Sequence, residues 1–437
     1  MLTASILSLF FWLAIAYMIA KQNRDMLAYP VIFVLLFIVS YPLKFILSYY
    51  GIAVMNPMVH DEDILNLTII IFNLSAAAFL IPWFILKRCE SPREMAINKK
   101  GTLKFNGIIL LVFLGVILIS ISAGASAMKA VFSFSSEALA NRIGERGLER
   151  TNSALAALLG LIGQIIMTLG VYRAAKQWDS LRKKEKSLLF AIACAGSIYL
   201  LALKGSKFIA LNHFFSFFVF LNIENIRHRK YVFTLTHLVM GLIGGLFIVG
   251  VFGVIRGFGT ASADSFVWGV FIQLSNAFDA PDNLSYILSR VKDLWFGDYS
   301  LSPTIQYLFA WVPRFLWPEK PLIYGNMFIQ QEYLYERFTD ETGEVVSPSM
   351  PGEMIVSGGV LFMLIWSLII GLIYLFSYRK ALASNNFIAP LVYAFLVTNV
   401  FGLLRSGTGV LGSLIFYLFG LFVVYYSIAL IKGASRH

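Results

Sequence analysis

Hydrophobic residues in this chain come in long, nearly unbroken runs rather than in short alternating patterns. Several runs reach the ~20 apolar residues that a helix needs to cross the hydrocarbon core of a bilayer. We predict about eleven spans, at 2–20, 28–50, 64–86, 105–124, 153–172, 187–203, 208–222, 233–254, 354–378, 386–404 and 410–431. The pattern therefore predicts an all-α polytopic integral membrane protein.

Basic clusters between the runs orient the predicted spans. KRCESPREMAINKK at 87–100, RAAKQWDSLRKKEK at 173–186 and IRHRK at 226–230 should face the cytoplasm by the positive-inside rule. The amino terminus is then expected outside and the carboxyl terminus inside. The chain is 58% hydrophobic and 14% charged with a net charge of +11. Because the cytoplasmic clusters account for that charge, we expect no nucleic acid partner.

The predicted topology divides the chain into three parts. Residues 1–254 hold eight spans and a basic outer segment at 125–152, residues 255–353 form a long outer segment, and residues 354–437 hold three more spans. The long outer segment is rich in aromatic residues and proline, as in WVPRFLWPEKP at 311–321, which predicts short interfacial helices. We find no inverted repeat, which speaks against a secondary transporter.

Two arginines stand at outer ends of spans, where basic residues are scarce. Arg256 in IRGFG and Arg405 in LRSGTG are each followed by glycines. Glycine lets backbone amides approach a ligand, and the guanidinium fork matches phosphate oxygens, so the pair is suited to hold a pyrophosphate without a metal. The alternative is ordinary snorkelling at helix ends. Arg314 is either a third member of this clamp or a partner of Glu319.

Other basic residues are also expected on the outer side. Arg142, Arg146 and Arg150 are spaced four apart and form a stripe on a helix, suited either to lipid phosphates or to an anionic substrate. Lys204 and Lys207 flank a turn between two short apolar runs. Charges at such depth line a site or pathway, or they snorkel to headgroups.

One carboxylate is placed where the outer segment re-enters the membrane. Glu353, in SPSMPGEMIVSGG, is suited to accept a proton from a substrate hydroxyl, or it is simply an acid at a helix start behind Pro351. The acidic triplet 61–63 admits a metal or favourable helix N-terminal charges. Cys89 and Cys194 have no partners at metal-ligand spacing, so we expect no metal and no cofactor.

These residues carry a resemblance to a known family. The span layout, PRFLWPEKP and then PSMPGEMIVSGG leading into a span resemble the bacterial oligosaccharide repeat-unit (O-antigen, Wzy-type) polymerases. Likeness in sequence concentrates in 200–210 and 250–410. GSK at 205–207 is similar to a position where relatives often have Gly-Ser-Arg, so lysine replaces arginine there. The related ligases use an outer-loop histidine, whereas the comparable stretch SPSMPGE has none.

The resemblance implies a GT-C-like fold and a glycosyltransferase of the bacterial inner membrane, with its active site facing the periplasm. Its substrate would be undecaprenyl-pyrophosphate-linked oligosaccharide, and its optional partner a chain-length regulator protein. Arg256 and Arg405 would hold the leaving pyrophosphate, and Glu353 would position or deprotonate the acceptor hydroxyl. The other basic residues would bind the second pyrophosphate or guide the lipid. An O-antigen ligase, a lipid-linked oligosaccharide flippase and a structural assembly partner stay open as alternatives.

Overall fold

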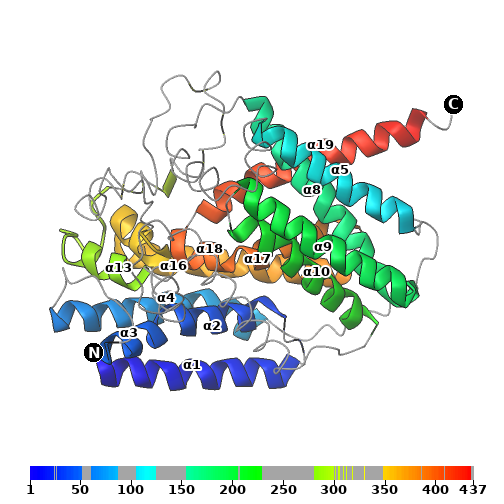
Figure 1. The fold of residues 1–437 in the computed structure, drawn as a ribbon. Coiled ribbons are helices and arrows are strands. Elements are labelled where there is room, and N and C mark those ends of the chain that lie inside the picture. Colours follow the sequence, from blue (N-terminus) through cyan, green and yellow to red (C-terminus); the bar gives the residue numbers. More distant parts are fainter. Residues whose placement is uncertain are drawn as a thin grey trace. The chain divides into compact units, whose positions relative to one another are not determined.

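The chain folds into helices throughout its described part. The computed structural model describes residues 1–51, 61–86, 105–124, 154–204, 207–228, 280–299 and 348–434, apart from single positions within them, and isolated positions between 301 and 329. Within these ranges the regular secondary structure is helical and no strand occurs (Figure 1). The prediction of an all-α protein is confirmed for this part of the chain.

The helices belong to two compact units. Unit 1 comprises Met1–Glu90, Phe233–Tyr378 and Asn399–Ser413, and unit 2 comprises Ser91–Val232, Arg379–Thr398 and Leu414–His437. Each unit therefore collects segments that lie far apart in the sequence. The division into three parts at residues 254 and 353 follows predicted topology and stays a prediction.

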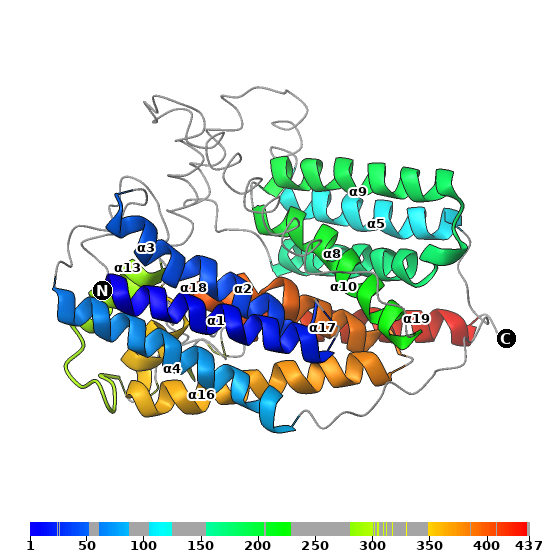
Figure 2. The same ribbon diagram turned by 90° about the horizontal axis from the view of Figure 1, so that it is seen from below.

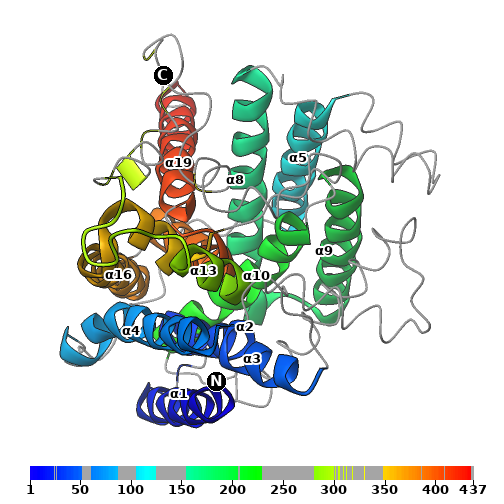
Figure 3. The same cartoon turned by 90° about the vertical axis from the view of Figure 1, so that its left-hand side faces the viewer.

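Unit 1 is built from long helices that run side by side. It contains α1 (Leu2–Asn23), α2 (Tyr29–Ser40), α3 (Pro42–Tyr49), α4 (Glu62–Leu86), α13 (Ala280–Leu288), most of α16 (Met350–Ala383) and α18 (Val400–Ser406). The helices α1, α2 and α4 lie alongside one another in Figures 1 and 2, and α1 and α16 are seen nearly end on in Figure 3. Exposed apolar side chains on their outer faces are typical of helices that meet lipid.

Aromatic rings fill the core of unit 1. The largest cluster joins α2, α4 and α16 and consists of Tyr29, Phe33, Phe79, Trp83 and Tyr374. At Gly371, α16 approaches α4 so closely that a Cβ would overlap the carbonyl oxygen of Phe79. The hydroxyls of Ser75 and Ser367 share a hydrogen bond at 3.1 Å across the same pair of helices. Glycine and serine thus permit a close helix crossing.

Polar contacts tie the helix ends of unit 1. The amino-terminal ammonium of Met1 and the carboxylate of Glu62 are 2.8 Å apart, which joins the starts of α1 and α4. Near the other end, the Tyr378 hydroxyl donates to Asp25 Oδ2 at 2.6 Å, which joins the end of the unit 1 part of α16 to the α1–α2 connection. Both contacts fit the alternating span directions that the sequence predicts.

Two predicted spans are divided in the structure. The apolar run 28–50 is interrupted at Tyr41, because Pro42 has no N–H and disfavours helical angles in the residue before it. The run 386–404 is interrupted at Asn399, which separates α17 (Ile388–Thr398) from α18. A third interruption falls inside α16, where Gly358 and Gly359 have non-helical backbone angles.

Unit 2 holds the second set of helices. It contains α5 (Phe105–Ala123), α8 (Ala154–Lys176), η1 (Trp178–Ser180), α9 (Lys183–Lys204), α10 (Lys207–Arg227), α17 and most of α19 (Gly409–Ala434). A Cβ on Gly115 of α5 would lie 2.7 Å from the carbonyl oxygen of Gly163 on α8, so these helices cross at close range. Arg227 donates to the carboxylate of Glu224 at 2.6 Å and to the carbonyl of Ser384 at 2.5 Å.

Seven helices of the described residues are long and apolar enough to cross a membrane. They correspond to the predicted spans 2–20, 28–50, 64–86, 105–124, 153–172, 354–378 and 410–431. These helices fit a multi-pass membrane protein. The spans predicted at 187–203 and 208–222 are the helices α9 and α10, which are not among the seven, and 233–254 lies outside the described residues. The count of eleven stays a prediction.

Candidate functional site at the start of α16

The start of α16 is fixed by its own first residues. Ser349 Oγ accepts a hydrogen bond from the Gly352 N–H at 3.2 Å, as a helix-capping serine does. Pro351 lies in the first turn, where a missing N–H leaves no bond unmade. The Glu353 N–H donates to the Ser349 carbonyl at 3.1 Å. These contacts set the direction in which the Glu353 side chain leaves the helix.

The end of α18 lies against this start. The Ser349 N–H donates to the carbonyl oxygen of Arg405 at 2.9 Å. The Gly407 N–H donates to the carbonyl oxygen of Leu403 at 2.9 Å and closes the last turn of α18. On the side of α2, the Tyr41 hydroxyl donates to the carbonyl oxygen of Leu404 at 2.7 Å. The backbone around Arg405 is therefore held from two sides within unit 1.

Glu353 packs directly on the turn that follows Arg405. Gly407 has a φ of 65° and a ψ of −131°, a conformation open to glycine and costly for other residues. A Cβ there would overlap Glu353 Oε2 and lie 3.3 Å from the Cα of Met350. The carboxylate thus occupies the space that any side chain at position 407 would need.

Burial separates the two predicted catalytic side chains of this junction. Glu353 has no exposed surface, whereas Arg405 is half-buried. A group that takes a proton from a bound substrate must reach that proton directly or through one water. In this geometry the Glu353 side chain is covered by the Gly407 turn. Of the two side chains, only that of Arg405 has exposed surface.

Beside this junction lies a buried ion pair that the sequence did not predict. Lys44 Nζ of α3 and Asp282 Oδ2 of α13 are 2.9 Å apart, and both side chains are buried. All nine residues of α13 are buried, including Asn283 and Ser285. A Cβ on Gly352 would lie 2.9 Å from Ile287 Cδ1, so α13 packs on the first turn of α16. The ion pair fixes the helix that supports the start of α16.

The sequence held one signal for this pair. Lys44 is the single charged residue in the apolar run 28–50, and a charge inside a span marks either a paired or a functional group. Its partner lies 238 residues further along the chain, in a segment predicted only as outer loop. Nothing in the spacing of the charges could connect the two.

Most other predicted site residues lie outside the described residues. These are Arg142, Arg146, Arg150, Arg256 and Arg314. Lys204 ends α9 and Lys207 begins α10, but the side chains of both are outside the described part. The structure therefore places Arg405 and Glu353 together and leaves the predicted pairing of Arg256 with Arg405 a prediction.

The acidic triplet 61–63 serves the start of α4. Asp61 Oδ1 accepts the Asp63 N–H at 2.9 Å, and Glu62 pairs with the amino terminus. Within the described ranges no group of three or more metal-ligating side chains comes together.

No protein-family model matches the chain, and no solved structure matches it. The described part of the candidate site thus offers a half-buried guanidinium next to a glycine turn, an arrangement suited to bind an oxyanion.

Proposed function

We propose that this protein is a glycosyltransferase that joins undecaprenyl-pyrophosphate-linked oligosaccharide repeat units into a surface polysaccharide, as O-antigen polymerases do. It would act at the periplasmic face of the bacterial inner membrane, with about eleven spans in a GT-C-like fold. The observation that supports this most is the junction of α16 and α18, where Arg405 is half-buried near the end of α18 and Glu353 packs on the Gly407 turn that follows it. The sequence resemblance, which includes PSMPGEMIVSGG, supports the same function.

The chemistry assigned to this junction is inverting transfer onto a sugar hydroxyl. The acceptor oxygen forms a bond to the anomeric carbon of the growing glycan while the bond from that carbon to pyrophosphate breaks. The acceptor proton leaves to a base or to water. Negative charge grows on the leaving undecaprenyl pyrophosphate, so a preorganised guanidinium accelerates the step by stabilising that charge. Arg405 supplies one such group, and Arg256 is the proposed second.

Glu353 acts through the turn rather than on the sugar. A buried carboxylate packed on Gly407 positions the backbone that carries Arg405. The sequence predicted that Glu353 positions or deprotonates the acceptor hydroxyl, and both roles need a side chain that reaches the substrate. Its burial favours a third role, the support of the Gly407 turn. The proton acceptor is then water or a group in the outer segment.

A reconstituted polymerisation reaction tests the function. Purified protein in detergent receives one synthetic undecaprenyl-pyrophosphate repeat unit and a chelator, and products are resolved on a gel. A ladder of multiples supports the polymerase, and Arg405→Ala should shorten or abolish it. Arg182→Ala, at an exposed position before α9, serves as the matched control and should leave the ladder intact. Transfer of finished glycan to a lipid core would indicate a ligase, and translocation of intact substrate in vesicles a flippase.

A further inference from the structure

A loop inserts its backbone into the interruption of α16. The Val360 N–H donates to the carbonyl oxygen of Leu294 at 2.9 Å, and the Asp298 N–H donates to the carbonyl oxygen of Val356 at 3.0 Å. A Cβ on Gly359, whose φ is 72°, would overlap the carbonyl of Trp295. The segment from 292 to 299 therefore satisfies a backbone N–H and a backbone carbonyl that the interruption leaves open, one on each half-helix.

The same loop is stiffened from within. Asp293 Oδ1 accepts the N–H groups of Trp295 and Phe296 at 2.9 and 3.0 Å. The carboxylate of Asp298 accepts the Lys292 N–H at 3.2 Å and the Asp293 N–H at 3.1 Å. The loop conformation is thus set by its own carboxylates as well as by α16.

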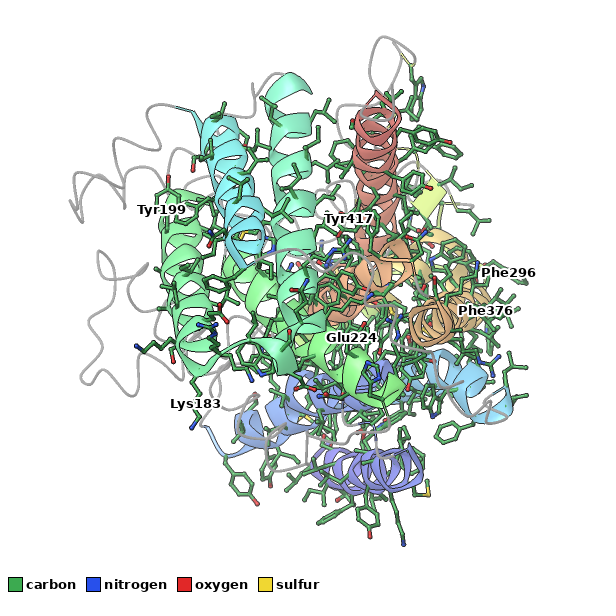
Figure 4. The ribbon with its side chains drawn as sticks, turned by 90° about the vertical axis from the view of Figure 1, so that its right-hand side faces the viewer. Lys183, Tyr199, Glu224, Phe296, Phe376 and Tyr417 are labelled. Carbon is green, nitrogen blue, oxygen red and sulfur yellow. The ribbon has the colours of Figure 1, made fainter. Side chains whose placement is uncertain are left out.

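This stiff loop nevertheless presents two large aromatic side chains outward. Trp295 is 60% exposed and Phe296 is 70% exposed. Ile305 and Phe309, which follow the loop, are also exposed. Adjacent exposed aromatics on a rigid backbone need a partner that accepts apolar surface. Figure 4, with α16 nearly end on, shows Phe296 and Phe376 pointing outward on the same side of this helix.

The apolar part of the second half-helix of α16, which ends before the basic residue Arg379, indicates what that partner is. From Val360 to Tyr378 the helix has about 19 residues and is ~28 Å long at the α-helical rise. The hydrocarbon core of a bilayer is ~30 Å thick. Arg379 and Lys380 follow at once and mark the cytoplasmic boundary by the positive-inside rule. The opposite boundary then falls at Gly358 and Gly359, where the loop is inserted.

We propose that the 292–299 loop is a lipid-docking element at the outer boundary of the membrane. Trp295 and Phe296 enter the headgroup region, and the inserted backbone satisfies the interrupted helix at a depth where water is scarce. Tryptophan at the membrane–water interface is the usual arrangement in spanning proteins. This proposal requires a membrane protein but no particular catalytic activity, so it is independent of the proposed function.

Depth measurements in vesicles test the placement. Single cysteines replace Phe296, Leu361, Ile365 and Phe376 in a chain from which Cys89 and Cys194 have been removed by serine substitution. Each cysteine carries a nitroxide, and the protein is reconstituted in phosphatidylethanolamine–phosphatidylglycerol vesicles. Collision rates with oxygen and with a water-soluble nickel chelate give the depth. All four replaced side chains are exposed, so the fold should tolerate the labels.

The four positions have a predicted order of depth. Ile365 should be deepest, about 8 Å inside the outer boundary by helical rise. Leu361 and Phe376 should be shallow, and Phe296 should lie at the headgroup boundary. A label on Lys183, exposed at the start of α9, gives the aqueous reference. A label at 296 as deep as the one at 365, or as water-exposed as the one at 183, would overturn the proposal.

Discussion

Alanine at position 407 should damage both the fold and the activity of the site. The methyl group would overlap Glu353 Oε2, the end of a fully buried side chain, and would lie 3.3 Å from the backbone Cα of Met350. The backbone angles of Gly407 add a cost of ~1–3 kcal/mol for a non-glycine residue. Displacing a buried carboxylate from its contacts adds ~1–3 kcal/mol. Gly407→Ala should therefore destabilise unit 1 by several kcal/mol.

The activity loss follows from the displacement of Arg405. If the turn shifts, the guanidinium loses its alignment with the leaving group, and each 1.36 kcal/mol of lost transition-state stabilisation slows the reaction about tenfold. A loss of ~10- to 100-fold in the rate of chain growth is expected for a misalignment that costs 1.4–2.8 kcal/mol. Gly402→Ala is the matched control on the same helix, because its Cβ would meet Val410 at 3.5 Å, an ordinary contact.

Thermal unfolding in detergent and the rate of ladder formation give the two readouts. In a Glu353→Ala background, which removes the overlapping carboxylate, Gly407→Ala should cost less stability than in the wild-type chain. The reasoning fails if Gly407→Ala matches Gly402→Ala in both assays. It also fails if the stability losses at 353 and 407 simply add, because residues in contact should show coupling.

Three further substitutions address other parts of unit 1. Glu353→Gln should lower the rate of chain growth, but activity should still fall at low pH as it does in the wild-type protein. If Glu353 were the general base, its removal would abolish that fall. Lys44→Met should destabilise the protein by ~3–5 kcal/mol in thermal or denaturant unfolding, because it leaves Asp282 buried without its cation. The double variant Lys44→Met/Asp282→Leu should lose less, and equal losses would contradict this. Gly371→Ala should lower the unfolding temperature, whereas Gly196→Ala, which has open space, should not.

Helices of this protein could be predicted from sequence where the chain has a long, continuous apolar run. The run 64–86 becomes α4 at Glu62–Leu86, and the run 105–124 becomes α5 at Phe105–Ala123. Hydropathy locates such helices because the membrane demands a continuous apolar surface and internally bonded backbone. The division at Tyr41 was also visible in principle, since Pro42 follows it.

The tertiary junctions could not be predicted in the same way. Gly358 and Gly359 are evident in the sequence, but only the insertion of a loop from some 60 residues upstream shows that they interrupt the helix. The contact of Glu353 with Gly407 likewise joins two separate spans. Periodicity and charge describe each segment alone, and they contain no information on which segments meet.

Membrane depth and burial together assign different tasks to Arg405 and Glu353. If the interruption of α16 marks the outer boundary, Glu353 belongs to the half-helix that precedes it, toward the level of the lipid headgroups. A lipid-linked pyrophosphate resides at that level, and of the two side chains Arg405 is the one with exposed surface. Glu353 then affects the reaction only through the Gly407 turn, which follows Arg405 at the end of α18. In an Arg405→Ala background, Glu353→Gln should therefore reduce chain growth little further, whereas independent roles would make the two losses multiply.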